Sequence, residues 1–392
     1  MGEAALNRHA VSNWIKGQYA FIKVGRRHGQ GVLRQAAGIL RCKLANPTLG
    51  ATDYYTYRFY DERIGGRADP RDYLGWRVME DVAHALNSRA VAMPGWDKYT
   101  FHLYAEKFGF PAAAVLAQFR PTAQAGAASS PPLLRSPAEL AAWLRLNQCW
   151  PVFAKPCYSM QSVGCFHLVG YHPEDDTLAL LDGGRIAVSD FVDRKVFGAS
   201  AGYFKREMGY LFQEVLRPHP AIVELVGNTT ISGARVVVVQ DEEGPEAIAA
   251  FWRIARENCV SDLWTGGRSG HLSAPIDLAS GRVGIAINGL ESKDYTHSPE
   301  TGRAIDGFVM PDWPQALAAC LDAATVFPLM RIQHWDIAFT DRGPKLLELN
   351  DVGNVGFIQT FGRGMLTPRL RKILREKGDA RRYPWIAKLC NR

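Results

Sequence analysis

The sequence predicts an α+β protein in which a mainly helical N-terminal region precedes a mixture of strands and helices. Three observations support this fold class. Apolar residues recur at helical spacing within residues 32–40 and 78–86. The run 229–239 (TTISGARVVVV) is strongly β-branched, as strands are. Residues 1–95 show neither a βαβ pattern nor G-x-G-x-x-G, which makes a dinucleotide-binding domain unlikely there.

Length and composition indicate an ordinary globular protein. The 392 residues, 47% hydrophobic and 22% charged, suffice for a large core and two or three domains. Residues 1–20 lack the apolar stretch of a signal peptide, and no apolar run reaches membrane-spanning length. Seven scattered cysteines without a C-x-x-C pair argue for reduced thiols, for a cytoplasmic location and against a zinc ribbon.

The positive charge is concentrated at the C-terminus. Residues 367–392 hold nine Lys and Arg against only Glu376 and Asp379, so the rest of the chain is nearly neutral despite a net charge of +7. This basic tail could bind nucleic acid or an anionic membrane surface, or it could be a solvated, partly helical cap. Leu370, Ile373 and Leu374 lie at helical spacing within it.

The elements before residue 150 are marked by caps and turns. The aromatic segment Asp53–Tyr60 could be helix or strand, and packing is its favoured role over base stacking. Asp97 can cap a helix that runs to Phe108 and stops at Gly109. Residues 121–136 read as a loop, and the Ser-Pro-Ala-Glu pattern from Ser136 predicts a second helix to about residue 146.

A strand, a loop and a returning strand follow. The strand 150–156 closes on Lys155 and Pro156, a loop rich in small residues occupies 157–164, and residues 165–169 form the second strand. Backbone amides and serines of such a flap can cover phosphates, and Lys155 can place its charge on phosphate oxygens. The alternative is an exposed lysine at a strand end. Cys157 is interpreted as a small filler residue.

Two arginines stand inside predicted strands. Residues 211–216 form a strand that ends in a hinge-like turn at 217–220. Arg235 lies within the β-branched run, and Arg253 lies within the next strand, 247–254. A buried arginine requires an anion or a carboxylate partner. Each arginine is therefore either an anion-binding group or one half of a structural ion pair. Residues 312–327 then predict a helix that Asp312 could cap.

Residues 332–349 predict a β-hairpin that carries two acids. With a three-residue loop Asp341–Gly343, Thr340 pairs with Pro344, and Asp336 comes opposite Glu348. Asn350 projects from the same face as Glu348. Two carboxylates and an amide oxygen are ligands suited to magnesium. The alternative places both acids at a solvated rim.

The order of these parts resembles the ATP-grasp superfamily, and within it the sugar-transfer-associated branch. The resemblance spans about residues 97–366, and its phrases are DKYTFHLYAEKFGFP, PVFAKPCYSMQSVG, FQEVLRPHPAI, NTTISGARVVVV and WDIAFTDRGPKLLELN. It implies an ATP-grasp fold with two α+β lobes clasping ATP. The implied divisions are a helical region 1–95, a first lobe 96–212, a second lobe 213–366 and the basic tail 367–392.

The resemblance also implies site residues and cofactors. ATP would be bound by Lys98, Lys155, Ser159, Ser162, Gln213, Glu214, Val215 and Leu216, with His219 or Glu224 toward the ribose. Mg²⁺ would be held by Asp336, Glu348 and Asn350. Arg235 and Arg253 would grip the transferring phosphate or the substrate carboxylate. Two departures stand out: no acid occupies the expected ribose position, and the usual preceding α/β lobe is missing.

The implied activity is a ligase that converts a substrate carboxylate to an acylphosphate and joins it to an amine. The substrates would be small molecules, peptides or saccharides. One alternative is a kinase acting on a hydroxyl, and another is a non-enzymatic anion-binding protein that uses the basic tail. Nucleic acid is an unlikely partner, because the protein body is nearly neutral. His167, His271 and His334 are interpreted as structural.

Overall fold

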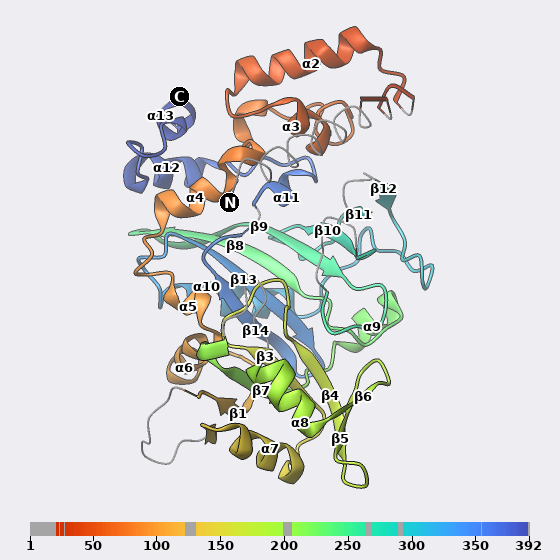
Figure 1. Ribbon diagram of the computed structural model, residues 1–392. Coiled ribbons are helices and arrows are strands. Elements are labelled where there is room, and N and C mark those ends of the chain that lie inside the picture. The colour runs from red at the N-terminus through yellow and green to blue at the C-terminus, as the bar shows by residue number, and fades with distance from the viewer. Residues whose placement is uncertain are drawn as a thin grey trace.

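The computed structural model describes residues 21–22, 24–26, 28–121, 131–198, 206–262, 269–288, 293–353 and 355–390. It contains one mixed sheet, one antiparallel sheet and a helical region at its N-terminal end (Figure 1). The predicted α+β class with a helical N-terminal region is therefore confirmed. Among the described residues, no helix combines the length and the apolar character needed to cross a membrane.

The first sheet has the strand order β2-β1-β7-β3-β4-β5-β6. Its strands are β1 (Val115–Phe119), β2 (Leu133–Leu134), β3 (Val152–Pro156), β4 (Phe166–His172), β5 (Thr177–Leu180), β6 (Arg185–Ala187) and β7 (Tyr210–Glu214). The short β2 lies in the segment predicted to be a loop, where it pairs with β1 in parallel. Part of that predicted loop, residues 122–130, lies outside the described residues.

The second sheet has the order β12-β11-β10-β9-β8-β13-β14. Its strands are β8 (Ala234–Asp241), β9 (Gly244–Ile254), β10 (Leu272–Ile276), β11 (Ala286–Asn288), β12 (Lys293–Tyr295), β13 (Ile332–Thr340) and β14 (Gly343–Asn350). Helices cover both faces of this sheet (Figure 1). The unbroken valine run of β8 follows from this, because Val236 and Val238 pack on one face and Val237 and Val239 on the other.

The helices are placed largely by local signals. They are α2 (Val32–Ala45), α3 (Ala51–Thr56), α4 (Met79–Leu86), α5 (Met93–Trp96), α6 (Lys98–Phe108), α7 (Pro137–Leu146), α8 (Val188–Asp190), α9 (Pro220–Val226), α10 (Trp313–Ala324), α11 (Val355–Gln359), α12 (Pro368–Lys377) and α13 (Trp385–Cys390). Short 3₁₀ turns occupy Pro70–Asp72, Trp76–Val78 and Arg206–Met208, and a π-helix follows α8 over Phe191–Phe197.

Three predicted helix starts can be checked against cap geometry. The Asp97 carboxylate accepts from the Tyr99 N–H (3.0 Å), and the Ser136 hydroxyl accepts from the Glu139 N–H (3.1 Å), as expected. Gly109 ends α6 with φ of 72°. The prediction for Asp312 is wrong: it stands in the left-handed region with φ of 51° and makes no side-chain cap bond.

The N-terminal aromatics form a small core of their own. Tyr54, Tyr57, Phe59, Tyr60 and Tyr73 are all buried there, so the favoured packing role is confirmed. The segment that could have been helix or strand is helix over Ala51–Thr56 and turn beyond it.

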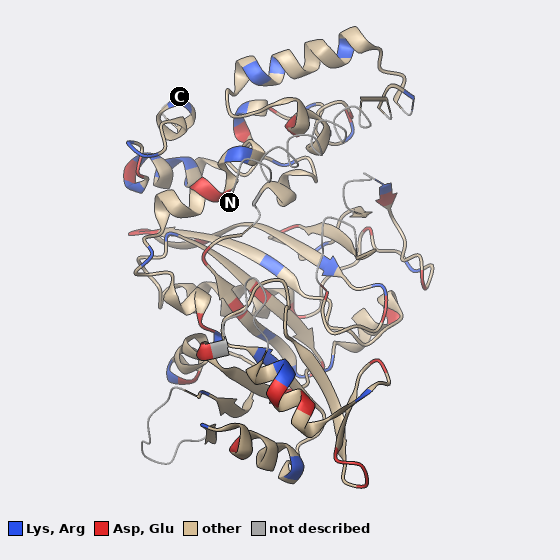
Figure 2. Ribbon diagram, viewed as in Figure 1, with Lys and Arg blue, Asp and Glu red and all other residues tan. Residues whose placement is uncertain are grey.

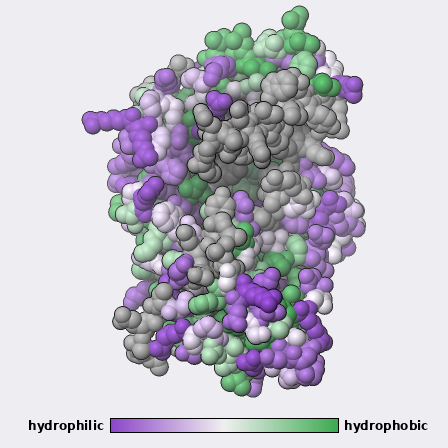
Figure 3. Space-filling view, viewed as in Figure 1, coloured by the Kyte–Doolittle hydropathy of each residue, from purple (hydrophilic) through white to green (hydrophobic). Residues whose placement is uncertain are grey.

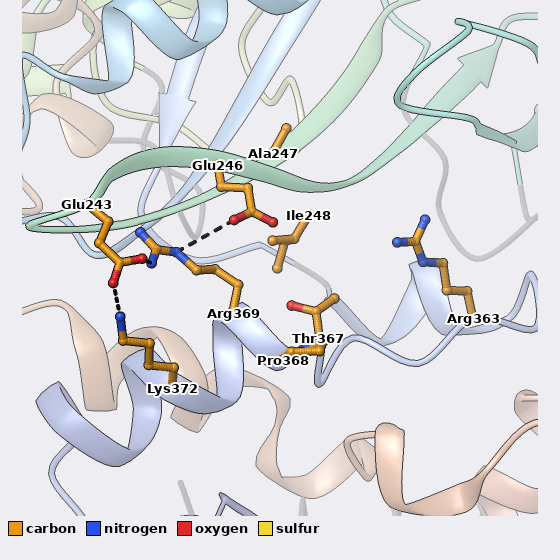
Figure 4. Close-up of a pocket in the computed structure, with 9 residues that line it drawn as sticks. All are labelled: Glu243, Glu246, Ala247, Ile248, Arg363, Thr367, Pro368, Arg369 and Lys372. Carbon is orange, nitrogen blue, oxygen red and sulfur yellow. Dashed lines mark hydrogen bonds and ion pairs between the residues drawn. The ribbon is translucent and has the colours of Figure 1, made fainter.

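The basic tail is a packed pair of helices. Leu370, Ile373 and Leu374 of α12 join α4 and α13 against the second sheet. Several of its cations are paired: Arg369 contacts Asp241, Glu243 and Glu246, and Lys372 contacts Glu243. Arg369 and Lys372 line a surface groove of about 490 Å³ (Figure 4). These ion pairs weaken the alternative in which the tail binds a polyanion.

Candidate functional site

The β13–β14 hairpin has the predicted acid pair but not the predicted turn. Thr340 pairs with Gly343, not Pro344, so the loop is one residue shorter than expected. Between the pairs Ile337–Leu346 and Asp336–Glu348, β14 contains one extra residue. This irregularity restores the pairing register that was predicted for Asp336. Asp336 consequently lies opposite Glu348, as predicted, and His334 lies opposite Asn350.

Asp336 is the buried centre of an ion-pair cluster. Arg235 on the neighbouring strand β8 donates through Nε to Oδ1 (2.6 Å) and through Nη2 to Oδ2 (2.7 Å). Arg253 on β9 adds a contact from Nη1 to Oδ2 at 3.4 Å. Burial opposes ionisation of Asp336, yet Arg235 and Arg253 outweigh it and hold its pKa below the usual range. Arg235 and Arg253 were each expected to need a charged partner, and the Asp336 carboxylate is a partner of both.

Asp262 is a second carboxylate beside Arg253, and no motif or spacing in the sequence had pointed to it. Its Oδ2 accepts the Gly233 N–H (2.7 Å) and lies 3.3 Å from the Arg253 Nε. The Arg253 N–H in turn donates to the Gly233 carbonyl (2.9 Å). A Cβ on Gly233 would come within 3.2 Å of Asp262 and 3.3 Å of Arg253. The three residues therefore form a closed, tightly packed circuit that fixes the guanidinium.

Glu348 on β14 contacts the start of α6. Its Oε2 lies 3.5 Å from the Nζ of Lys98, which is the first residue of α6. The Asn350 amide donates to Glu348 Oε1 (3.3 Å), so its own oxygen still has acceptor capacity. The side chain of Glu348 is 27% exposed against 3% for Asp336. Glu348 is therefore the more accessible of the two acids.

The flap lysine predicted from the strand end is buried, not exposed. Lys155 on β3 is only 8% exposed. Burial lowers its pKa to about 8, with Lys98 also lowering it and Glu348 raising it. Lys98 donates from Nζ to the Ser159 carbonyl (3.0 Å), which ties α6 to the flap. Ser162, in the flap's left-handed turn, offers its carbonyl to the Cys165 N–H (3.1 Å).

The charge balance of this cluster favours an anion. Four cations, Lys98, Lys155, Arg235 and Arg253, surround three carboxylates, Asp262, Asp336 and Glu348. Taken as fully ionised, the cluster has one unbalanced positive charge. A phosphate group would supply the missing negative charge and meet donors from both sheets.

The donor chemistry also fits a magnesium ion in part. Glu348 and Asn350 present hard oxygen ligands on one strand face, as Mg²⁺ requires. Both oxygens of Asp336, in contrast, already accept from guanidinium groups. Among the described residues, no group of three His, Cys, Asp or Glu side chains is arranged to hold a metal. Glu348 and Asn350 fit the ion as they stand, and Asp336 would have to release Arg235 first.

The predicted hinge residues lie at the end of β7, and several are engaged. The Gln213 amide contacts the His102 Nε2 (2.7 Å) and donates to the Ala113 carbonyl, so it is directed toward α6. The Glu214 carboxylate accepts from the Ala114 N–H (2.9 Å) and from Arg342. His219 caps α9 by accepting the Ala221 N–H on Nδ1 (3.1 Å). Glu224, the alternative toward the ribose, pairs with Arg303.

Val215 and Leu216 follow directly after β7 and are half-buried. Their backbone groups form no backbone hydrogen bond with any described residue. Main-chain donors and acceptors beside a strand end are what the edge of an adenine ring would need.

The histidines and cysteines near the site have structural surroundings. His334 is buried with a pKa lowered to about 3 by burial and by Arg235, and Gly353 lies against its ring. His271 contacts the Cys259 thiol at 3.7 Å, and burial lowers the pKa of His167. Burial raises the pKa of Cys157 to about 12, which suits the filler role expected of it.

The comparisons with known proteins agree with the resemblance found in the sequence. Residues 187–375 match the family model described as sugar-transfer associated ATP-grasp, just under half of the chain. That segment is similar to ATP-grasp proteins. The suspected resemblance is thereby confirmed. No curated protein sequence matches the chain.

Solved structures similar to the chain are distant. An N5-carboxyaminoimidazole synthase from Aspergillus clavatus has a TM-score of 0.36 and 11% identity, over 75% of this chain and 58% of its own. The VanG D-Ala:D-Ser ligase from Enterococcus faecalis has a TM-score of 0.39 and 10% identity, over 71% and 59%. The chain thus spans less than two thirds of either structure. Likenesses at this level carry no argument about activity.

Proposed function

We propose that the protein is an ATP- and magnesium-dependent ligase that joins a carboxylate to an amine. The observation that carries the proposal is the convergence of Lys98, Lys155, Arg235 and Arg253 on the acid pair Asp336 and Glu348. These groups come from α6, β3, β8, β9 and the β13–β14 hairpin. The ATP-grasp match over residues 187–375 supports the same reading.

In this proposal the lysines hold the phosphates. Lys155 projects from the first sheet and Lys98 from the start of α6, so the phosphates would lie between the two lobes. The flap residues Ser159 and Ser162 would cover them, and the backbone of Val215 and Leu216 would meet the adenine. Glu214 already has two partners and would support the hinge through Ala114 and Arg342.

Glu348 and Asn350, joined by Asp336 once Arg235 is released, would hold Mg²⁺. The ion, when bound, would neutralise charge on the phosphate oxygens. The substrate carboxylate would attack the γ-phosphorus, giving an acylphosphate and ADP. The amine would then attack the acyl carbon and expel phosphate. Arg235 and Arg253 would steady the transferring group, since such transfers depend on positioning and charge neutralisation.

The experiment is a screen of paired substrates. The protein is incubated with ATP, Mg²⁺, a panel of carboxylates and a panel of amines, and ADP release and product mass are followed. Release that requires both partners, with an amide product, supports the ligase. A phosphate ester formed from a hydroxyl compound alone would establish the kinase alternative instead.

Two lysine substitutions on helix α6, one at the site and one away from it, test whether the turnover in that screen depends on the proposed site. Lys98→Met should remove ATP-dependent turnover, because it deletes a cation that contacts Glu348. Lys107→Met changes an exposed lysine near the end of the same helix and should leave turnover unchanged. Equal turnover in both variants would show that Lys98 does not act on the nucleotide.

A further inference from the structure

Helix α2 carries an exposed leucine stripe that the proposed activity does not use. Leu33 is 86% exposed, Leu40 57% and Leu44 74%. Only Gln35 and Cys42 of this 14-residue helix are buried. Figure 3 shows hydrophobic residues gathered at the end of the molecule where Figure 1 places α2.

The stripe faces directly away from the protein. At about 100° per residue, Leu33, Ala37, Leu40 and Leu44 fall within roughly 60° of arc. The buried Gln35 and Cys42 lie on the opposite side by the same arithmetic. Gln35 fixes that orientation, since it donates to the Gln30 carbonyl (2.8 Å) and accepts from the Tyr55 hydroxyl (2.9 Å).

Cations flank the stripe on both edges. Arg34 and Arg41 lie about 80–100° to one side of it, and Lys43 lies about 80° to the other. Helix α2 contains no acidic residue, and its ribbon in Figure 2 shows only basic positions. Arg34 contacts Glu62 at 3.2 Å, and Lys43 donates to the Pro47 carbonyl at 2.6 Å, both in exposed positions. Glu62 offsets the charge of Arg34, whereas Lys43 meets only a carbonyl and Arg41 has no acid partner among the described contacts, so the outer face keeps two cations beside the leucines.

We propose that α2 docks this face on an anionic lipid surface. A central apolar stripe between two basic edges matches a helix lying in the membrane interface, where leucines enter the acyl boundary and cations meet headgroups. A helix of 14 residues is about 21 Å long and cannot span a bilayer. Pairing with a second copy of α2 would oppose like charges, because the helix has no acid to offset them.

The charges set the expected lipid dependence. Each Lys or Arg at an anionic surface strengthens binding by about fivefold, so Arg41 and Lys43, which have no acid partner among the described contacts, together favour it by about 25-fold. Binding should weaken with salt for the same reason. This docking would hold the protein at the membrane through α2, whereas no helix among the described residues is able to span a bilayer.

Vesicle sedimentation of the full chain tests the proposal. Vesicles contain phosphatidylcholine alone or phosphatidylcholine mixed with phosphatidylglycerol. The wild type should pellet with the mixed vesicles only. The combined variant Leu33→Glu, Leu40→Glu and Leu44→Glu should bind at least about tenfold more weakly. The variant Leu146→Glu alters an exposed leucine on α7 and should bind as the wild type does.

A second variant keeps the proposal testable if the triple leucine variant does not fold. Replacing Arg34, Arg41 and Lys43 by Gln preserves the apolar stripe and should abolish the preference for anionic vesicles. The proposal is overturned if the wild type binds neither vesicle type, or if Leu146→Glu binds as weakly as the leucine variant. Self-association in sedimentation velocity that the α2 variant abolishes, without vesicle binding, would assign the face to a second copy.

Discussion

Replacing Asp336 with Asn should destabilise the protein strongly even before any ligand is added. The carboxylate is the shared partner of Arg235, through contacts of 2.6 and 2.7 Å, and of Arg253, at 3.4 Å. The side chains of the two arginines are only 18% and 13% exposed. Their charges would remain in place after the substitution, with Asp262 the sole remaining acid on Arg253 and none on Arg235 among the described contacts.

The size of the effect follows from that burial. Removing one member of a buried ion pair costs about 3–5 kcal/mol, because the other charge is left uncompensated. An exposed pair contributes about 0–1 kcal/mol. Asp341, in the turn of the same hairpin, is exposed and lies 3.9 Å from the Arg342 Nε. Asp341→Asn is therefore a matched control that should change stability by less than about 0.5 kcal/mol.

Urea unfolding followed by far-ultraviolet circular dichroism gives the free energy of unfolding for each variant. The two substitutions remove the same charge from the same hairpin, so their difference isolates the effect of burial. A loss below about 1 kcal/mol for Asp336→Asn would refute the assignment of a buried carboxylate shared by two arginines.

Two further predictions concern the lysine and the second acid. Burial, assisted by Lys98, lowers the pKa of Lys155 to about 8. Nucleotide affinity, measured by isothermal titration, should therefore fall as pH rises through 8, because Lys155 loses its charge. The variant Lys155→Met should show no such pH dependence. Because the unfolded chain holds that proton up to about pH 10.5, the same group should make stability rise between pH 8 and 10.5. Asp262→Asn should loosen Arg253 and weaken binding of a γ-phosphate analogue of ATP by about tenfold while leaving ADP binding unchanged. Equal effects on both nucleotides would show that Asp262 has only a structural role.

The sequence predicted correctly those features that depend only on neighbouring residues. The caps at Asp97 and Ser136 depend on neighbouring residues, and both are present as expected. The two strand arginines were expected to need charged partners, since burial of an unpaired charge is costly. Which partner each would find depended on strand order, and the antiparallel pairing of β13 with β8 places Asp336 directly beside Arg235.

Features that depend on tertiary packing escaped prediction. The turn at Gly343 is one residue shorter than predicted, and β14 contains one extra residue further along. The two changes in register cancel each other. Counting residues from the wrong loop therefore still paired Asp336 with Glu348. Asp262 reaches Arg253 only because residues 257–262 fold against the loop before β8. Composition shows the tail only as a basic segment. In the structure, Arg369 of α12 pairs with Asp241 at the end of β8 and with Glu243 in the turn that follows.

The most direct test of the proposed site is the magnesium dependence of ATP binding, measured by isothermal titration with and without Mg²⁺. We expect the wild type to bind ATP more tightly when Mg²⁺ is present, because Glu348 and Asn350 offer oxygens to the ion. Glu348→Gln should remove most of that dependence while retaining the fold, since Glu348 is the more exposed of the two acids. A wild type that does not bind ATP, or a Glu348→Gln variant with unchanged magnesium dependence, would contradict the proposed site.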